Sequence, residues 1–166
     1  LQKSGDQIYA AFALSVIGWA HSYLGHPQEA LSYRSQGQRL TQELGGRIIF
    51  SDWLTAADAE IALRTGDAER AILLAEQCVP HFQKEERIYA LGLAEQVWGL
   101  ALGRRNPRQI AEADAHLVTG LALMEATEQG LPAARLRLKW ADMCRRRGSV
   151  EQTAARRAQA VAKVEA

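Results

Sequence analysis

The sequence predicts an all-α fold of about four antiparallel helix pairs, because a turn pattern recurs along it and no strand-like alternation is present. The turn pattern places a residue that suits a helix end just before one that suits a helix start. Its copies lie 41, 39 and 43 residues apart, a spacing typical of repeated helix pairs. Alanine and leucine dominate and only four prolines occur, which also favours helices. The turn pattern is found at residues 24–31, 65–69, 105–109 and 147–151.

The first pair is expected at residues 6–24 and 27–44, where apolar residues recur at helical spacing. Gly18 is costly inside a helix, so a neighbouring helix should approach closely there. Pro27 suits the first turn of the second helix, and the glycines at 45–46 suit its end. The larger residues expected to point inward from the first helix are Ile8, Phe12, Leu14, Ile17, Tyr23 and Leu24.

The second pair is expected at residues 48–64 and 67–79. Asp67 is a good cap for the second of these helices. Pro80 is expected to end or kink it, because a proline ring clashes with the preceding helical turn. Residues 82–87 are then expected to form a frayed exit.

The third and fourth pairs are justified by three further turn residues. Asn106 and Pro107 suit the start of a long helix, and Gly130 is expected to close it. Ser149 suits the cap of an alanine-rich last helix whose end should fray. The four helices are expected at residues 87–102, 107–128, 132–147 and from 149 onward.

Composition fits a globular chain with a single domain over residues 1–166. The chain is 48% hydrophobic and 23% charged, and no low-complexity linker divides it. Cys78 and Cys144 lie 66 residues apart, which fits reduced core thiols in a cytoplasmic protein. The most apolar run, residues 9–20, is shorter than a membrane span requires. Because the sequence begins with Leu1 rather than Met, we expect a fragment of a longer multidomain protein.

Charge is distributed unevenly along the chain. Residues 1–83 carry six basic and nine acidic side chains, whereas residues 84–166 carry fourteen and ten. Within residues 131–166 the counts are nine and three, which favours an acidic protein surface or peptide as partner. Nucleic acid is disfavoured, because its binding surfaces interleave basic and aromatic residues and Trp140 is the only aromatic residue in this segment.

The spacing of reactive residues gives no indication of catalysis. The four histidines form neither H-x-x-x-H nor H-E-x-x-H, and no nucleophile elbow or phosphate-binding glycine loop occurs. Cys144 precedes three arginines, a pattern typical of a basic helix end. The sequence therefore predicts no catalytic residue, no metal site and no cofactor.

The residues from Leu14 to Leu31 resemble a tetratricopeptide repeat, with Gly18, Gly25 and Ala30 at the small-residue positions of that family. A second copy keeps Ala59, Gly66 and Ala71 at the same mutual spacing, a fourth keeps Trp140, Ala141 and Gly148, and the third is the weakest. His21 stands where the family usually has an aromatic residue, and the spacing of about 41 exceeds the family's 34. HEAT-like repeats fit this length equally well.

The resemblance implies a right-handed superhelical solenoid of helix pairs. The long spacing is similar to that of repeat arrays in large bacterial signalling and transcriptional regulators. The concave side of such an array binds partners. For Trp19 the sequence leaves two positions open, one on that concave surface and one in the core. Carried onto this sequence, the family's register gives Trp19, Tyr23, Trp53, Glu60, Arg64, Gln96, Arg104, Arg135, Asp142, Arg145 and Arg146 as groove residues.

The function expected from these patterns is non-catalytic. We expect a scaffold or sensor module that binds a protein or peptide within a larger regulatory protein. The alternative is a homo-oligomerisation module in which the array packs on a second copy of itself. A membrane partner is not expected.

Overall fold

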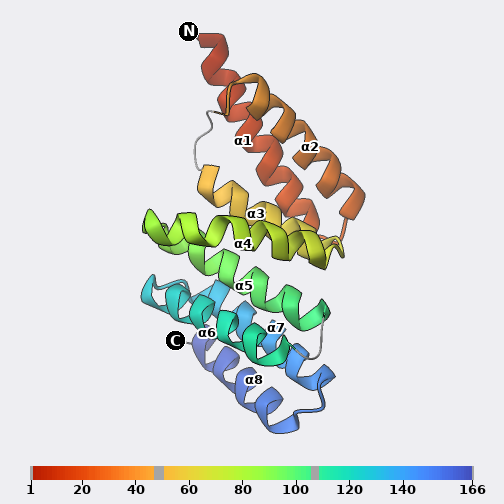
Figure 1. Ribbon diagram of the computed structural model, residues 1–166, viewed down its shortest axis with the longest axis vertical. Coiled ribbons are helices and arrows are strands. Elements are labelled where there is room, and N and C mark those ends of the chain that lie inside the picture. The colour runs from red at the N-terminus through yellow and green to blue at the C-terminus, as the bar shows by residue number, and fades with distance from the viewer. Residues whose placement is uncertain (1, 47–50, 106–108, 166) are drawn as a thin grey trace.

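The computed structural model describes residues 2–46, 51–105 and 109–165, which form eight helices and no strand. The helices follow one another along the long axis of the molecule, with the N-terminal pair at one end and the C-terminal pair at the other (Figure 1). The all-α prediction is confirmed. The helices are α1 (Gln2–Tyr23), α2 (Pro27–Glu43), α3 (Ser51–Arg64), α4 (Ala68–Lys84), α5 (Ile88–Arg105), α6 (Ile110–Ala126), α7 (Gly130–Arg146) and α8 (Val150–Glu165).

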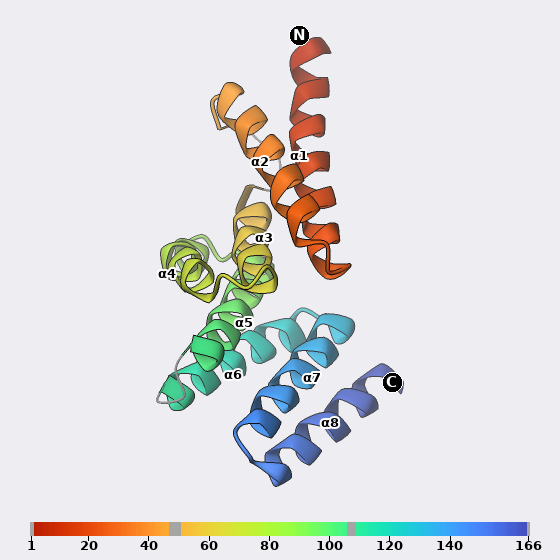
Figure 2. The same ribbon diagram turned by 90° about the vertical axis from the view of Figure 1, so that its right-hand side faces the viewer.

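Consecutive helices pack against each other in a repeat-like manner. Within each pair the two helices are close partners, and the odd-numbered helices also touch in order, α1 on α3, α3 on α5 and α5 on α7 (Figure 2). The first helices of successive pairs therefore lie next to one another along the molecule. This arrangement brings residues far apart in the sequence onto one side.

Several predicted features fall outside the described residues. These are the start of the third helix with Ile48 and Phe50, and the cap formed by Asn106 and Pro107. Within the described part, Asp67 caps α4 as predicted, since its carboxylate accepts a hydrogen bond from the Arg70 backbone N–H at 2.9 Å.

After two of the helices, the residue with positive φ is a glutamate rather than a glycine. Gly25, Gly66 and Gly148 adopt the positive φ that closes a helix. After α4 and α6 the same conformation is taken by Glu86 (φ 53°) and Glu128 (φ 57°). The prediction that Gly130 closes the sixth helix was wrong, because Gly130 is the first residue of α7. A left-handed conformation costs roughly 1–2 kcal/mol for a residue with a Cβ, which packing elsewhere must offset.

Pro80 does not end the fourth helix. Helix α4 continues to Lys84, so the first half of the predicted frayed exit, residues 82–84, is helical. Pro80 and Glu76 are both exposed, so water can reach the Glu76 carbonyl that the proline leaves without an N–H donor. On the opposite side Val79 and Phe82 are buried, Phe82 to 1% exposure, and their burial stabilises the last turn.

Helices α1 and α2 cross through small residues rather than through the large apolar residues predicted to point inward. A Cβ at Gly18 would lie 2.9 Å from both the Ala30 carbonyl oxygen and the Arg34 backbone nitrogen, so the predicted close approach is confirmed. By contrast Ile17, Tyr23 and Leu24 are 40%, 42% and 68% exposed, and the expectation that they point inward was wrong. The crossing leaves no room for large side chains between the two backbones.

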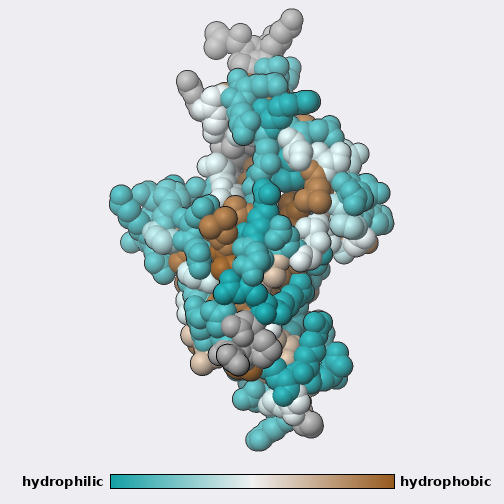
Figure 3. Space-filling view, turned by 45° about the vertical axis from the view of Figure 1, so that its right-hand side comes forward, coloured by the Kyte–Doolittle hydropathy of each residue, from teal (hydrophilic) through white to brown (hydrophobic). Residues whose placement is uncertain are grey.

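The main hydrophobic core is built by α3 to α7. Its largest fully buried side chains are Phe82, Leu102, Leu117 and Leu136. Both cysteines are buried and free, and burial raises the pKa of the Cys78 thiol to about 12. On the face shown in Figure 3, the exposed hydrophobic surface gathers near the middle of the molecule, and most of both ends is hydrophilic.

Candidate functional site

A groove of about 580 Å³ lies between the C-terminal part of α1 and the first turns of α7, with α3 and α5 behind it. We name it the aromatic groove. Because the odd-numbered helices lie side by side, it collects residues from all four helix pairs. Its lining residues are Val16, Trp19, Ala20, Tyr23, Leu24, Trp53, Tyr89, Leu93, Gln96, Met124, Gln129, Pro132, Arg135 and Lys139.

Four aromatic rings form one wall of this groove. Trp19 and Tyr23 are one helical turn apart on α1 and meet edge to face, with ring centres 6.0 Å apart. Trp19 also meets Trp53 of α3 edge to face at 4.8 Å, and Trp53 lies 6.3 Å from Tyr89 of α5. Such edge-to-face pairs stabilise by about 0.5–1.5 kcal/mol beyond the area that they bury. The rings are thus held as a contiguous unit.

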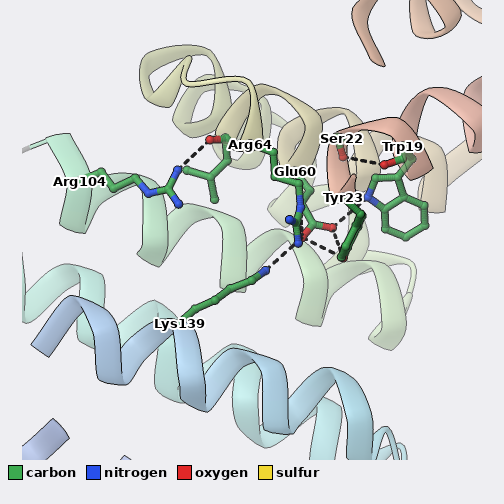
Figure 4. A network of polar contacts seen from close by, with 8 residues as sticks. Trp19, Ser22, Tyr23, Glu60, Arg64, Arg104 and Lys139 are labelled. Carbon is green, nitrogen blue, oxygen red and sulfur yellow. Dashed lines mark hydrogen bonds and ion pairs between the residues drawn. The ribbon is translucent and has the colours of Figure 1, made fainter. Parts of the chain in front are cut away.

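A buried carboxylate anchors this wall. The side chain of Glu60 on α3 is 0% exposed and accepts hydrogen bonds from the Trp19 indole N–H at 2.9 Å and from the Tyr23 hydroxyl at 2.9 and 3.0 Å. Arg64 donates to it at 2.9 and 3.0 Å, and the Lys139 ammonium at 3.2 Å (Figure 4). The Arg64 guanidinium carbon lies 3.5 Å from the centre of the Tyr23 ring. The two oxygens of the Glu60 carboxylate therefore hold side chains from α1, α3 and α7 in place.

The charge states of this network follow from burial and neighbouring charges. Burial raises the pKa of the Glu60 carboxyl, but the charges of Lys139 and Arg64 outweigh it, so the pKa lies below its ordinary value. Burial lowers the pKa of Lys139, and Arg64 and Arg104 lower it further against the attraction of Glu60. Burial and the charge of Glu60 raise the pKa of Tyr23 to about 12. At neutral pH, Glu60 is ionised and Tyr23 is a neutral hydrogen-bond donor.

The ion pair between Lys139 and Glu60 crosses the groove. Over the described residues, the backbones of α3 and α7 do not come into contact. The Lys139 side chain spans this distance from α7, as Figure 4 shows. It is therefore a side-chain bridge between the second and the fourth helix pair.

A second groove, of about 610 Å³, lies next to the first, between α5 and α7. We name it the basic groove. Lys139 lines both grooves. The Arg104 guanidinium donates to the Leu63 carbonyl oxygen at 2.8 Å, and its pKa is lowered by burial and by the like charges of Arg146 and Arg64. The residues that line this groove are Leu100, Gly103, Arg104, Ile110, Lys139, Asp142, Met143, Arg146 and Arg147.

The structure brings most of the sequence-predicted site residues together in these two grooves. Arg145 instead pairs with Asp142 at 3.7 Å. Trp19 is half-buried, so it contributes both to packing and to the groove wall. Trp19, Tyr23, Trp53, Gln96 and Arg135 line the aromatic groove, Arg104, Asp142 and Arg146 line the basic groove, and Glu60 and Arg64 form the network beside Tyr23.

Among the residues of the site that were not singled out from the sequence are Lys139 and Tyr89. Lys139 lies one helical turn after Arg135, so the helical spacing of α7 could have placed it on the same side. Tyr89 lies near the start of α5, and the uncertain alignment of the third repeat hid its register. The other two tryptophans, Trp98 and Trp140, pack inside the array, Trp98 against the His116 ring at 4.0 Å.

The chemistry that this arrangement supports is recognition. Its aromatic wall can contact an apolar or aromatic group, and its cations can pair with carboxylates. Among the described residues, no three His, Cys, Asp or Glu side chains gather where they could hold a metal ion. The helices of the described part are each too short or too polar to cross a membrane.

Comparisons of this chain with protein-family models, with curated proteins and with solved structures find no match.

Proposed function

We propose that this chain is a non-catalytic scaffold that binds a protein or peptide segment in the aromatic groove. The observation that carries the proposal is the wall of Trp19, Tyr23, Trp53 and Tyr89, which borders a groove of about 580 Å³. Tyrosine, tryptophan and arginine are the side chains that most often anchor protein interfaces. The size of the groove suits one or two side chains of a bound segment.

The wall is ordered before any partner arrives. Glu60 holds Trp19 and Tyr23 through hydrogen bonds, and Arg64 covers one face of the Tyr23 ring. Ordering a flexible side chain on binding costs about 0.5–1.5 kcal/mol, and a preorganised wall avoids much of that cost. This favours binding over a purely structural role for the network.

The charges around the groove favour an acidic segment as partner. Arg135 is exposed at the edge of the groove, with its guanidinium carbon 5.8 Å from the centre of the Tyr23 ring. Among the described residues, no carboxylate forms an ion pair with Arg104, Arg135 or Arg146. We therefore propose a partner segment that combines an apolar or aromatic residue with acidic residues.

The proposed context follows the resemblance described above. The recurrence at 41, 39 and 43 residues and the side-by-side packing of the odd-numbered helices support a tetratricopeptide-like array. In that proposal the array is a right-handed superhelix, both grooves lie on its concave side, and the chain is a cytoplasmic module of a larger bacterial regulator.

The test is to select peptides and then block the groove. Random twelve-residue peptides displayed on phage are selected on the immobilised chain, and the affinity of the enriched peptides is measured by fluorescence anisotropy. Ala20 is exposed and lines the groove, so Ala20→Arg adds bulk there without touching Glu60. We expect this variant to bind the selected peptides at least about tenfold more weakly, because the added side chain occupies the site.

Ala13 supplies the matched control. It is also exposed on α1 but does not line the groove, and Ala13→Arg should keep the affinity within about twofold. Equal affinities for the Ala20 and Ala13 variants would show that the segment binds elsewhere.

Self-association is a second candidate function, favoured by one stripe on α1. The exposed residues of this stripe are all apolar and follow helical spacing. The helix carries only Lys3 and Asp6 as charged residues, so two antiparallel copies would bring no like charges together. The occupant that we propose is therefore a second copy of the same helix. The stripe consists of Tyr9, Ala13, Ile17, Ala20 and Leu24.

A further inference from the structure

The basic groove carries more positive charge than its own carboxylates balance. Arg104 and Arg146 both line this groove, the charge of Arg146 helps to lower the pKa of Arg104, and among the described residues neither forms an ion pair with a carboxylate. The one carboxylate in the lining, Asp142, is already shared by Arg145 at 3.7 Å and Arg157 at 3.6 Å. The positive charge at the centre of this groove is therefore left for a ligand to neutralise.

Lys139 adds to this excess. Its only carboxylate partner among the described residues is Glu60, which Arg64 also contacts. One buried negative charge thus faces two cations, and Arg104 lies near both of them. Like charges held together in a groove raise the local concentration of anions and speed their association. The arrangement is electrostatically unfavourable until an anion binds.

Part of the lining of the basic groove is apolar, and we call this part its floor. Leu100, Ile110 and Met143 contribute carbon and sulfur atoms, and Gly103 presents no side chain. Glutamate side chains, which carry a carboxylate on two methylene groups, suit such a floor because the stem can lie on apolar surface while the charge meets a guanidinium. A free inorganic anion would gain nothing from this floor.

The two grooves are adjacent. Lys139 lines both, so a chain that places one residue against the aromatic wall passes Lys139 on its way to Arg104 and Arg146. The Arg104 guanidinium is held in place by the Leu63 carbonyl oxygen at 2.8 Å (Figure 4).

We infer that the basic groove is a specificity subsite for side-chain carboxylates, in which Arg104, Lys139 and Arg146 bind an acidic stretch of the segment whose apolar or aromatic residue occupies the aromatic groove. This inference rests on the proposed function and specifies the chemistry of its partner. Specificity comes from the cations of the basic groove, of which Arg104 and Arg146 form no ion pair among the described residues, and position along the array comes from the aromatic wall.

The experiment uses defined probes and two matched double variants. The probes are a fluorescein-labelled hexaglutamate peptide with capped termini, the same peptide made of glutamine, inorganic phosphate, and a labelled oligothymidine of ten nucleotides. The first variant is Arg104→Gln with Arg146→Gln. The control is Arg105→Gln with Arg145→Gln, which removes the adjacent arginines that already pair with Glu69 and Asp142. Both variants lose the same net charge.

We expect the wild-type chain to bind hexaglutamate at low salt, and to bind hexaglutamine and phosphate at least about tenfold more weakly. The Arg104 and Arg146 variant should lose about tenfold in affinity for hexaglutamate and show a weaker dependence on salt. The control variant should stay within about twofold of wild type. Circular dichroism of each variant establishes that the fold is retained.

Four results would overturn the inference. Equal losses in the two double variants would mean that net charge alone attracts the peptide. No binding of hexaglutamate by the wild type would mean that the groove has no carboxylate preference. Tighter binding of oligothymidine that depends on Arg104 and Arg146 would assign the groove to nucleic acid. If the phage-selected peptides depend on Ala20 but not on these arginines, the proposed function stands and only the carboxylate subsite falls.

Discussion

At the scale of single residues, Glu60 decides the geometry of the site. The helical register implied by the repeat resemblance placed this residue in a groove, but it could not show that the carboxylate would be fully buried. That burial depends on Trp19 and Tyr23 from α1 and on Lys139, which lies 79 residues away. Local spacing predicts which residues share a helix face, whereas a contact over 79 residues depends on how the pairs stack.

Glu60→Gln should destabilise the fold by about 3 kcal/mol, because it leaves Arg64 and Lys139 without a charge partner. We place the loss at the low end for a buried pair, since Arg64 and Lys139 keep some contact with water. Glu43→Gln is the control, because the Arg39–Glu43 pair is exposed and should change stability by less than about 0.5 kcal/mol. Urea unfolding of both variants measures the difference, and similar losses would contradict the role given to Glu60.

The same substitution gives a pH test. The pKa of Glu60 in the folded chain lies below its ordinary value, so its contribution is complete above the unfolded pKa of about 4.3. The contribution is lost as the pH falls through the lower, folded pKa. Wild type should therefore lose more stability than Glu60→Gln on acidification below about pH 4.3. Parallel curves for the two proteins would show that another group carries the acid sensitivity.

At the scale of helices, the sequence predicted where helices occur better than where they end. Pro80 was expected to end or kink α4, but the helix does not end there and continues to Lys84, where the burial of Phe82 stabilises its last turn. Gly130 was expected to close α6, but Glu128 takes the left-handed conformation instead. Helix propensity describes a residue apart from its tertiary contacts. The packing that overrides this propensity at a helix end comes from residues of other helices.

The crossing of α1 and α2 gives a prediction at this scale. Gly18→Ala should destabilise by about 1–3 kcal/mol, because the new Cβ would lie 2.9 Å from backbone atoms of Ala30 and Arg34 that have little freedom to move. Gly130→Ala is the control, since nothing lies within 4 Å of its Cβ position and alanine favours a helix by up to about 1 kcal/mol. In thermal unfolding, the midpoint temperature should be lower than wild type for Gly18→Ala, and unchanged or higher for Gly130→Ala. A gain in both would mean that the two helices are not in close contact.

At the scale of the whole molecule, the turn pattern predicted eight paired helices but not the distribution of the core. The large buried side chains belong to α3 to α7, whereas α1 meets α2 through small residues and exposes an apolar stripe. From sequence alone the apolar residues of α1 were assigned to the interior. An apolar stripe and a buried face have the same periodicity, so only the packing of the neighbouring helices separates them.

The exposed stripe predicts the oligomeric state under the second candidate function. Sedimentation equilibrium over about 5–200 µM should show a dimer for wild type and a monomer for Ile17→Glu, because a charge in the stripe opposes its burial. Val118→Glu is the control, since Val118 is also exposed but lies on α6, and it should still dimerise. A wild-type chain that stays monomeric over this range would exclude self-association through α1.

The ion pair between Lys139 and Glu60 also affects how the chain unfolds. In a linear repeat array each unit contacts only its neighbours, so unfolding can start at one end and proceed pair by pair. Here a charge on the fourth pair compensates a buried carboxylate on the second, and the third pair is passed over. Detaching the last pair therefore removes one of the two cations that contact Glu60 two pairs away, and the buried charge that holds Trp19 and Tyr23 of the first pair becomes less stabilised. Unfolding one pair at a time from an end is therefore less favourable. The terminal pairs should unfold together, and more cooperatively than contacts between neighbouring pairs alone would produce.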